Sequence, residues 1–190
     1  MVDALYNVPS LALWTIFNEG WGQFDSLKVY DFIKKLDPTR TVDPASGWHD
    51  QGGKDLLSIH RYWYPFRIKR NKKGQAVVNW VPGHVTEKLS RPVVLSEYGG
   101  YSYQEKGHVF SDKIFGYKVY GNKEDLNGGL KKLFEGEMEV AMKNGLAAAV
   151  YTQLTDVESE INGLVTYDRK VVKIDRNMLK TINDRLVIEE

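Results

Sequence analysis

The sequence contains no cysteine. This excludes disulfides and thiolate metal sites but is compatible with both cytosolic and oxidising compartments. Net charge is almost absent, since 26 Lys and Arg face 25 Asp and Glu, so no long-range field recruits nucleic acid or an anionic membrane. No apolar run approaches the roughly 18 residues of a membrane span, and the N-terminus shows no signal-peptide pattern. We therefore expect a neutral partner and leave the compartment open.

Apolar and aromatic residues are plentiful. The chain of 190 residues is 42% hydrophobic and 27% charged, which is ordinary for a soluble domain with a sizeable core. Aromatic residues make up 12% of the chain, and many lie beside the expected strand ends, where they suit stacking against sugar rings. There is no internal repeat and no low-complexity segment.

Two glutamates, Glu19 and Glu97, each follow an apolar run. Runs of this length bounded by turn residues predict buried parallel strands, and in α/β barrels the chemistry lies at the C-terminal ends of such strands. Two carboxyl groups delivered this way can face each other. Two facing carboxyl groups in different environments, one protonated and one ionised, are what acid-assisted cleavage of a glycoside requires.

Apolar runs and helical periodicity predict an alternation of strands and helices, which favours an α/β fold with a parallel sheet. A complete eight-stranded barrel needs about 200 to 250 residues, so the sheet is either open or part of something longer. Expected strands cover residues 11–17, 39–43, 55–60, 93–95 and 146–152, and expected helices cover 26–36, 129–144 and 175–187, with a hairpin over 161–172 that turns at Asp168.

Three further segments show weaker patterns. The basic stretch 67–73 predicts a solvated loop rather than an anion site. Residues 78–91 are ambiguous, with a short helix expected around 85–89. Residues 98–121 are rich in Gly, Tyr and charge without periodicity, so we expect a long functional loop over the site.

The segments Trp14-Thr-Ile-Phe-Asn18-Glu19-Gly-Trp21 and Val94-Leu-Ser-Glu97-Tyr-Gly99-Gly100 resemble the strand-four and strand-seven signatures of retaining glycoside hydrolases with a (β/α)8 barrel. More narrowly, they are similar to family 2, the β-galactosidase, β-glucuronidase and β-mannosidase group. Residues 37–40 and 156–164 also resemble that family. The resemblance implies one partial TIM-barrel domain over residues 1–190, roughly strands 4 to 8 with their helices, without the N-terminal strands and β-sandwich domains.

By this resemblance Glu19 is the general acid/base, Glu97 is the nucleophile, and Asn18 hydrogen-bonds the sugar 2-hydroxyl. A carbohydrate is the expected substrate, and we expect no cofactor and no metal. The remaining candidates for substrate binding lie at or after the expected strand ends: His60, Tyr62, Trp48, Trp63 and Tyr101.

Simpler roles are open for each of these residues. Each glutamate could cap a strand or pair with an arginine such as Arg61, and Asn18 could be a turn residue. His60 could be a hydrogen-bonded core residue, and the aromatic candidates could be loop packing. Residues 151–154 replace the tryptophan segment of many family members, so the choice of sugar is open.

Three functions compete. The first is a retaining exo-β-glycosidase, most similar to β-galactosidases, and the second is a non-catalytic carbohydrate-binding module. The third, an open α/β domain for a phosphorylated metabolite, ranks last because no Gly-rich phosphate loop follows any strand. A partial barrel would expose the edges of its first and last strands, so we expect self-association and weak or absent turnover on aryl β-glycosides.

Overall fold

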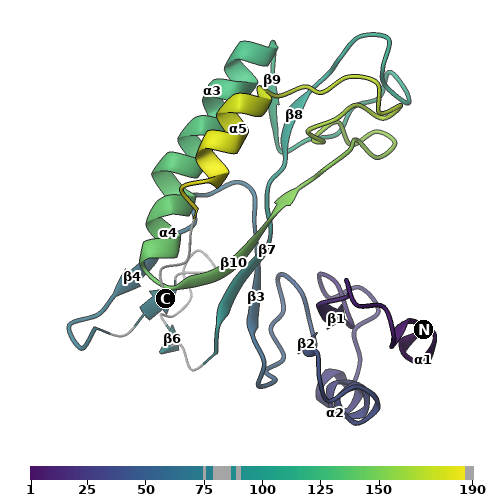
Figure 1. Ribbon diagram of the computed structural model, residues 1–190, viewed down its shortest axis with the longest axis vertical. Helices are drawn as coiled ribbons and strands as arrows, with labels where there is room; N and C mark the ends of the chain where they lie inside the picture. The colour runs from purple at the N-terminus through teal and green to yellow at the C-terminus, as the bar shows by residue number, and fades with distance from the viewer. Residues whose placement is uncertain (75, 79–86, 89–90, 187–190) are drawn as a thin grey trace.

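The computed structural model describes residues 1–74, 76–78, 87–88 and 91–186. Figure 1 shows its helices and strands. The helices are α1 (Val2–Leu5), α2 (Ser26–Leu36), α3 (Lys123–Leu133), the π-helix η1 (Phe134–Met138), α4 (Glu139–Lys143) and α5 (Arg176–Asn183). The strands are β1 (Leu13–Thr15), β2 (Thr41–Asp43), β3 (Leu57–Arg61), β4 (Ile68–Arg70), β5 (Ala76–Val78), β6 (Glu87–Lys88), β7 (Val93–Gly99), β8 (Tyr101–Tyr103), β9 (Lys118–Tyr120) and β10 (Leu146–Thr152).

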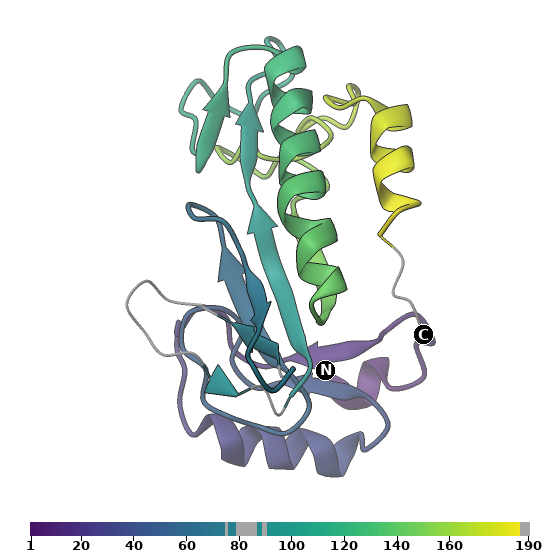
Figure 2. The same cartoon turned by 90° about the vertical axis from the view of Figure 1, so that its left-hand side faces the viewer.

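The central sheet is parallel and has the order β10-β7-β3. Its apolar residues, such as Leu57, Ile59 and Leu95, are almost fully buried. The helices α3, η1 and α4 lie along one side of this sheet, as Figure 2 shows for β7. β3 is buried at every position, whereas β10 is exposed from Ala147 to Val150. The positions of these strands were predictable because each contains an apolar run.

The five expected strands are present, but they form two parallel sheets and not one continuous sheet. β1 and β2 form a separate parallel pair that packs against α2, around Trp14, Tyr30 and Val42. This pair and its helices form the lower right part of Figure 1. Between β2 and β3 the chain makes side-chain contacts, such as Ser46 Oγ to Ser58 Oγ at 3.2 Å, in place of a backbone ladder among the described residues.

The long helical segment begins earlier than its periodicity predicts. Residues 123–143 are helical without a break, and Asn122 caps the segment by accepting a hydrogen bond of 2.8 Å from Asp125 N. The apolar stripe predicts a start at Gly129, and the two glycines at 128 and 129 disfavour a helix. Burial of Leu126 and Leu130 against the sheet overrides that propensity.

Other irregular segments also contain strands. The basic stretch 67–73 includes β4, which pairs with β5, so it is not only a loop. The long stretch 98–121 includes the parallel pair β8-β9. The helix expected around 85–89 falls mostly outside the described residues, and Glu87–Lys88 form β6.

Two expected elements near the C-terminus are shorter in the structure. The hairpin expected over 161–172 is reduced to a turn, because Val165 and Val172 make a single antiparallel bridge. α5 ends at Asn183, before the predicted end at 187.

A buried carboxylate joins the N-terminal segment to the first strand pair. Asp37 accepts hydrogen bonds from Trp14 Nε1 at 2.9 Å and Arg40 Nη1 at 2.7 Å. Burial alone would raise the pKa of Asp37, but hydrogen bonds from Thr39, Trp14 and Arg40 hold it well below its usual range. Arg40 also donates to the carbonyls of Tyr6, Val8 and Leu11. The segment from Asp37 to Arg40 therefore holds the N-terminal residues and β1 in place, which is a structural role.

β10 has one strand partner, β7, among the described residues, and Val150 on it is exposed. An uncovered strand edge of this kind favours pairing with another chain. Self-association stays a prediction. In the described ranges, every helix falls short of the length and apolar content needed to cross a membrane.

Candidate active site

Glu19 lies in a tight segment after β1. Its backbone N donates to Ser46 O at 2.8 Å, and Ile16 N donates to Asp43 O at 3.0 Å, so the chain after β1 follows the chain after β2. Glu19 has a φ of +54°, which is uncommon for a residue with a side chain. Such conformations persist where the surrounding structure holds them, and they cluster at functional sites.

Glu97 lies near the C-terminal end of β7, directly opposite His60 of β3 in the parallel register. The register shifts between Ile59 and His60, and such irregularities re-aim side chains beside active sites. The shift places His60 opposite Glu97 instead of Ser96.

His60 links the two glutamates. Its Nδ1 lies 2.7 Å from Glu19 Oε1 and 3.2 Å from Glu97 Oε2. Ligand atoms of the three residues all lie within 4.8 Å of one another. An ionised Glu97 carboxylate only accepts hydrogen bonds, which favours the tautomer of His60 that carries its proton on Nδ1. The fully buried ring therefore holds both carboxyl groups at one place.

Three serines surround the other side of His60. Ser46 Oγ lies 2.9 Å from His60 Nε2, and it also contacts Ser58 Oγ at 3.2 Å and Ser96 Oγ at 3.1 Å. Ser58 and Ser96 are 2.6 Å apart. The buried carboxyl of Asp43 lies next to this cluster; burial raises its pKa, and hydrogen bonds from Ser58, Ala45 and Ser46 oppose that rise. The cluster leaves His60 little freedom to rotate.

Tyr62 approaches Glu97 from the end of β3. Its hydroxyl donates to Glu97 Oε2 and also lies 3.1 Å from Thr152 Oγ1. Its ring stacks on Tyr117, with centroids 3.8 Å apart and planes 4° from parallel. Tyr117 comes from the long stretch 98–121, so part of that stretch does reach the site.

The charge of Glu97 is set by opposing effects. Burial raises the pKa of Glu97, while the hydrogen bond from Tyr62 and the nearby His60 lower it, and the charges of Glu19 and Glu160 raise it. Burial also raises the pKa of Tyr62, and its bond to Glu97 adds to that rise. Tyr62 therefore stays a hydrogen-bond donor to the carboxylate.

The other predicted site residues divide into two groups. The ring of the half-buried Trp48 meets the His60 ring edge-on, with centroids 5.9 Å apart, and stacks on the exposed Trp63 with centroids 6.4 Å apart. Both tryptophans therefore belong to the surroundings of His60. Asn18 is exposed, one position before Glu19, and its backbone bridges to Ser46. Tyr101 is placed differently: its ring packs against Tyr120 at 5.5 Å and under the Lys118 ammonium at 5.0 Å.

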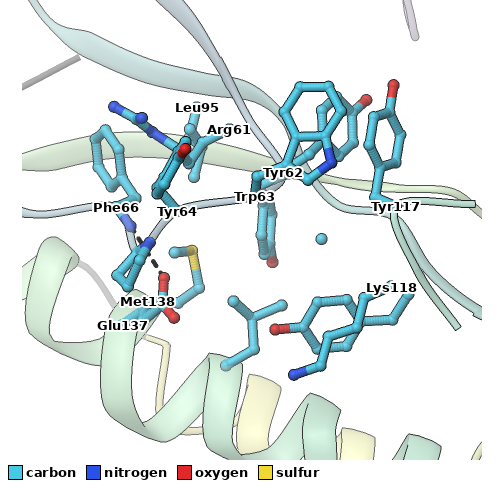
Figure 3. A pocket seen from close by; sticks show the side chains of 15 residues that line it. Arg61, Tyr62, Trp63, Tyr64, Phe66, Leu95, Tyr117, Lys118, Glu137 and Met138 are labelled. Carbon is cyan, nitrogen blue, oxygen red and sulfur yellow. Dashed lines mark hydrogen bonds between the residues drawn. The ribbon is translucent and has the colours of Figure 1, made fainter. Parts of the chain in front are cut away.

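A cavity of about 280 Å³ lies next to Tyr62. Figure 3 shows Tyr62 and Tyr117 on one side of it and Glu137 and Met138 of η1 on the other. Tyr101 lines this cavity, and so does Arg61, whose guanidinium lies in the field of Glu137. Arg61 thus points to the helix side of β3, and the alternative that it pairs with a site glutamate gains no support.

Sequence reasoning missed the serine cluster, Asp43 and Tyr117. Serines give no periodic or spacing signal, because their role depends on which strands meet. The one local signal was the glycine at position 47, whose φ in the structure is +100°. A Cβ there would lie 2.7 Å from His60 Nδ1, so the chain passes close to the histidine at this residue.

Glu19, His60 and Glu97 are also residue types that can bind a metal. Both ring nitrogens of His60 are already engaged, Nδ1 by the glutamates and Nε2 by Ser46. A metal on Nδ1 would have to replace the bonds that hold the carboxyl groups together. Since no further feature of the site points to an ion, we assign none, and the expectation of a metal-free site stays a prediction.

Comparison with known proteins shows that the chain is similar to several β-galactosidases. A β-galactosidase of Leuconostoc mesenteroides is 24% identical over 121 residues, which cover 63% of this chain and 11% of the relative. A β-galactosidase of Kluyveromyces lactis is 34% identical over 98 residues, or 49% of this chain and 8% of the relative. One of Aeromonas hydrophila is 27% identical over 128 residues, again 63% and 11%.

The chain thus spans about a tenth of the length of these curated relatives. A family model described as "Glycosyl hydrolases family 2, TIM barrel domain" matches residues 1–180. The α/β content and the parallel sheets agree with that domain. Because the match extends over nearly the whole sequence, this chain belongs to glycosyl hydrolase family 2.

Proposed function

We propose that this chain carries the catalytic pair of a retaining β-glycosidase that acts on β-galactosides or a related sugar. The observation that carries the proposal is the Glu19–His60–Glu97 cluster, whose ligand atoms lie within 4.8 Å of one another. Retaining enzymes hold their two carboxyl groups about 5 to 5.5 Å apart, whereas inverting enzymes need about 6.5 to 9.5 Å for a water molecule. The short separation favours retention.

In this mechanism Glu97 attacks the anomeric carbon while Glu19 donates a proton to the glycosidic oxygen. The bond between the anomeric carbon and that oxygen breaks, and the leaving group departs as an alcohol. Glu19, now ionised, then takes a proton from water, whose oxygen displaces Glu97 from the sugar. Tyr62 donates to Glu97 Oε2, and His60 Nδ1 lies 3.2 Å from the same oxygen, so both favour the ionised nucleophile against the effect of burial.

We also propose that β1, β2, β3, β7 and β10 are the fourth to eighth strands of a family 2 barrel, and that residues 1–190 form one domain. Their order along the chain and the parallel pairing of β3, β7 and β10 support this. Glu19 and Glu97 then occupy the strand-four and strand-seven positions at the C-terminal edge, where barrel enzymes place their chemistry.

A mechanism-based 2-fluoro glycoside tests the function, because its covalent adduct accumulates even where turnover is slow. We expect intact mass spectrometry to show one added 2-fluoroglycosyl group, and peptide mapping to locate it at Glu97. Reversible binding without an adduct would instead favour the carbohydrate-binding module, which the exposed ring of Trp63 beside the cluster also fits.

The pH dependence of labelling tests the role of Tyr62. Glu97 must be ionised to attack, and burial raises its pKa above the usual 4.5, so labelling should fall with decreasing pH along a limb centred above pH 4.5. Tyr62→Phe removes a donor to the ionised form, so the limb should move to higher pH by about one to two units, since a bond to a charged group is worth about 1.5 to 3 kcal/mol. An unshifted limb in Tyr62→Phe would contradict this role.

Substitution at Gly47 tests whether the position of His60 matters. Gly47→Ala places a methyl group against the His60 ring, so labelling of Glu97 should fall by about tenfold or more as the hydrogen bonds to the carboxyl groups are lost. Gly74→Ala is the matched control, because Gly74 also has a positive φ, +75°, but nothing lies within 4 Å of its added Cβ. Equal loss of labelling in both variants would attribute the effect to backbone strain alone.

A further inference from the structure

A stretch of positive charge on the surface of the chain takes no part in the proposed reaction. The sequence contains no acidic residue between Asp55 and Glu87, and β4 lies within this interval. The exposed cations around β4 form no ion pair among the side chains that the structure describes. They are Arg67, Lys69, Arg70, Lys72 and Lys73. The basic stretch 67–73 is therefore a local positive patch on a chain whose net charge is only +1.

A groove, which we call the β4 groove, runs along this patch. It is a cavity of about 590 Å³ between β4 and the helical segment η1–α4, and Figure 1 shows β4 beside α4. One wall of the groove consists of consecutive residues, 66–70. Because successive side chains of a strand point to opposite faces, a wall of consecutive residues is an edge of the strand and not one of its faces.

The edge of β4 that borders the groove can pair with another strand. Within the described ranges β4 pairs with β5 alone, in antiparallel register from Ile68–Val78 to Arg70–Ala76. None of the described residues of β5 belongs to the lining of the groove, so the groove follows the opposite edge of β4. The backbone N–H and C=O groups of such an edge are a template for an added strand.

The lining of the β4 groove combines apolar side chains with cations. Phe66 and Ile68 are buried, and Val140 on α4 is 49% exposed. Glu137 is the one acidic residue among the described lining, and its Oε2 already accepts a hydrogen bond of 3.0 Å from Phe66 N. The cations of the lining are Arg67, Lys69 and Arg70. The groove therefore suits a chain that carries both carboxylates and apolar side chains.

We propose that the β4 groove binds an extended acidic segment of another polypeptide, which adds as a strand to the outer edge of β4. The carboxylates of this segment face the cations of the basic stretch, and its apolar side chains cover Ile68 and Val140. Nucleic acid and anionic membranes fit less well, because the net charge of +1 gives no long-range attraction and the site is a groove along a strand edge. The proposal goes beyond the proposed function, since neither Glu19 nor Glu97 lines this groove.

The test uses the whole chain and a fluorescently labelled peptide of alternating glutamate and valine, whose binding is followed by anisotropy. A second peptide has lysine in place of glutamate, and we expect it not to bind. A third keeps the glutamates but has proline in place of the valines, which removes backbone N–H donors. It should bind about tenfold more weakly than the first, the worth of one or two backbone hydrogen bonds.

Hydrogen exchange followed by NMR shows where the first peptide lies. The amides of β4 that point away from β5 should exchange more slowly when the peptide is bound. The amides of β9 are the control, because β9 also has one strand partner, β8, among the described residues. Their exchange should not change.

Reversing charge in the basic stretch tests the role of the cations. Lys69→Glu/Arg70→Glu should weaken binding of the first peptide by about tenfold or more, because like charges then face each other. Arg169→Glu/Lys170→Glu is the matched control, since these two exposed residues are also adjacent cations but lie outside the groove lining. The control variant has the same net charge and should keep the affinity within about twofold.

Filling the groove tests its shape without changing charge. A Cβ on Gly136 of η1 meets no described atom within 4 Å, although Gly136 lines the groove. Gly136→Phe therefore places a ring in the groove and should weaken binding about as much as the charge reversal. Gly128→Phe is the control, because Gly128 on α3 has equally open space around its added Cβ and does not line the groove.

Two results with the acidic peptides overturn the inference: equal affinity of the proline peptide, and unchanged exchange in β4 when the first peptide is bound. Equal weakening by Gly136→Phe and Gly128→Phe does so as well. Heparin and phosphatidylserine vesicles probe the other partner classes. If either binds, loses binding in Lys69→Glu/Arg70→Glu, and the acidic peptide does not bind, the basic stretch serves a polyanion or a membrane and the inference is wrong.

Discussion

Glu19→Gln should slow labelling of Glu97 by a factor of about 100 to 10,000 when the 2-fluoro glycoside has a poor leaving group, because general acid catalysis contributes about that much. With a dinitrophenyl leaving group the loss should be small, since that group departs without a proton. The two rates, followed by intact mass, give a leaving-group dependence that is steep in the variant and shallow in the wild-type chain. A purely structural role for Glu19 would slow both substrates alike.

Glu139→Gln is the control for this experiment. Glu139 is also a half-buried glutamate, but it lies on α4 and pairs with Arg185 at 3.2 Å. Its loss should leave the leaving-group dependence unchanged. If Glu19→Gln behaves like Glu139→Gln, Glu19 is not the acid, and the assignment that rests on the strand-four resemblance is wrong.

Asp156→Leu should lower the free energy of unfolding by about 3 to 5 kcal/mol, the usual cost of leaving one partner of a buried ion pair alone. Lys173 Nζ donates to Asp156 Oδ1 at 2.7 Å, to Ile161 O at 2.8 Å and to Tyr103 O at 3.1 Å. Both side chains are almost fully buried. This pair holds the segment after β10 against β8, and urea denaturation measures its contribution.

The double variant Asp156→Leu/Lys173→Met should recover most of that loss. Burial raises the pKa of Asp156 and lowers the pKa of Lys173, and their mutual hydrogen bond only partly opposes these shifts. Desolvation therefore exceeds attraction, and an apolar pair of similar volume is tolerated. The exposed pair Lys180–Asp184 is the control, because Asp184→Ala should change stability very little. A double variant no more stable than Asp156→Leu would contradict this account.

Much of the candidate site could be predicted from local sequence. Glu19 and Glu97 follow apolar runs, and His60 and Tyr62 follow a third one, so parallel packing of these segments predicts that their ends meet. His60 lies on β3 and Glu97 on β7, and the structure describes the register of these two strands directly. Tyr101 shows the limit of this reasoning, since its nearness to Glu97 in sequence did not place it with the site aromatics.

The sequence by itself determined the elements whose signal is local: the strands β3, β7 and β10, the amphipathic helix α2, and the two carboxyl groups at strand ends. Only the tertiary structure decided which side chains surround those groups. Ser46, Ser58 and Ser96 meet behind His60, and Tyr117 stacks on Tyr62, across separations of 12 to 55 residues. Periodicity describes how one segment buries its own face, whereas these contacts exist only once distant segments have closed around a shared core.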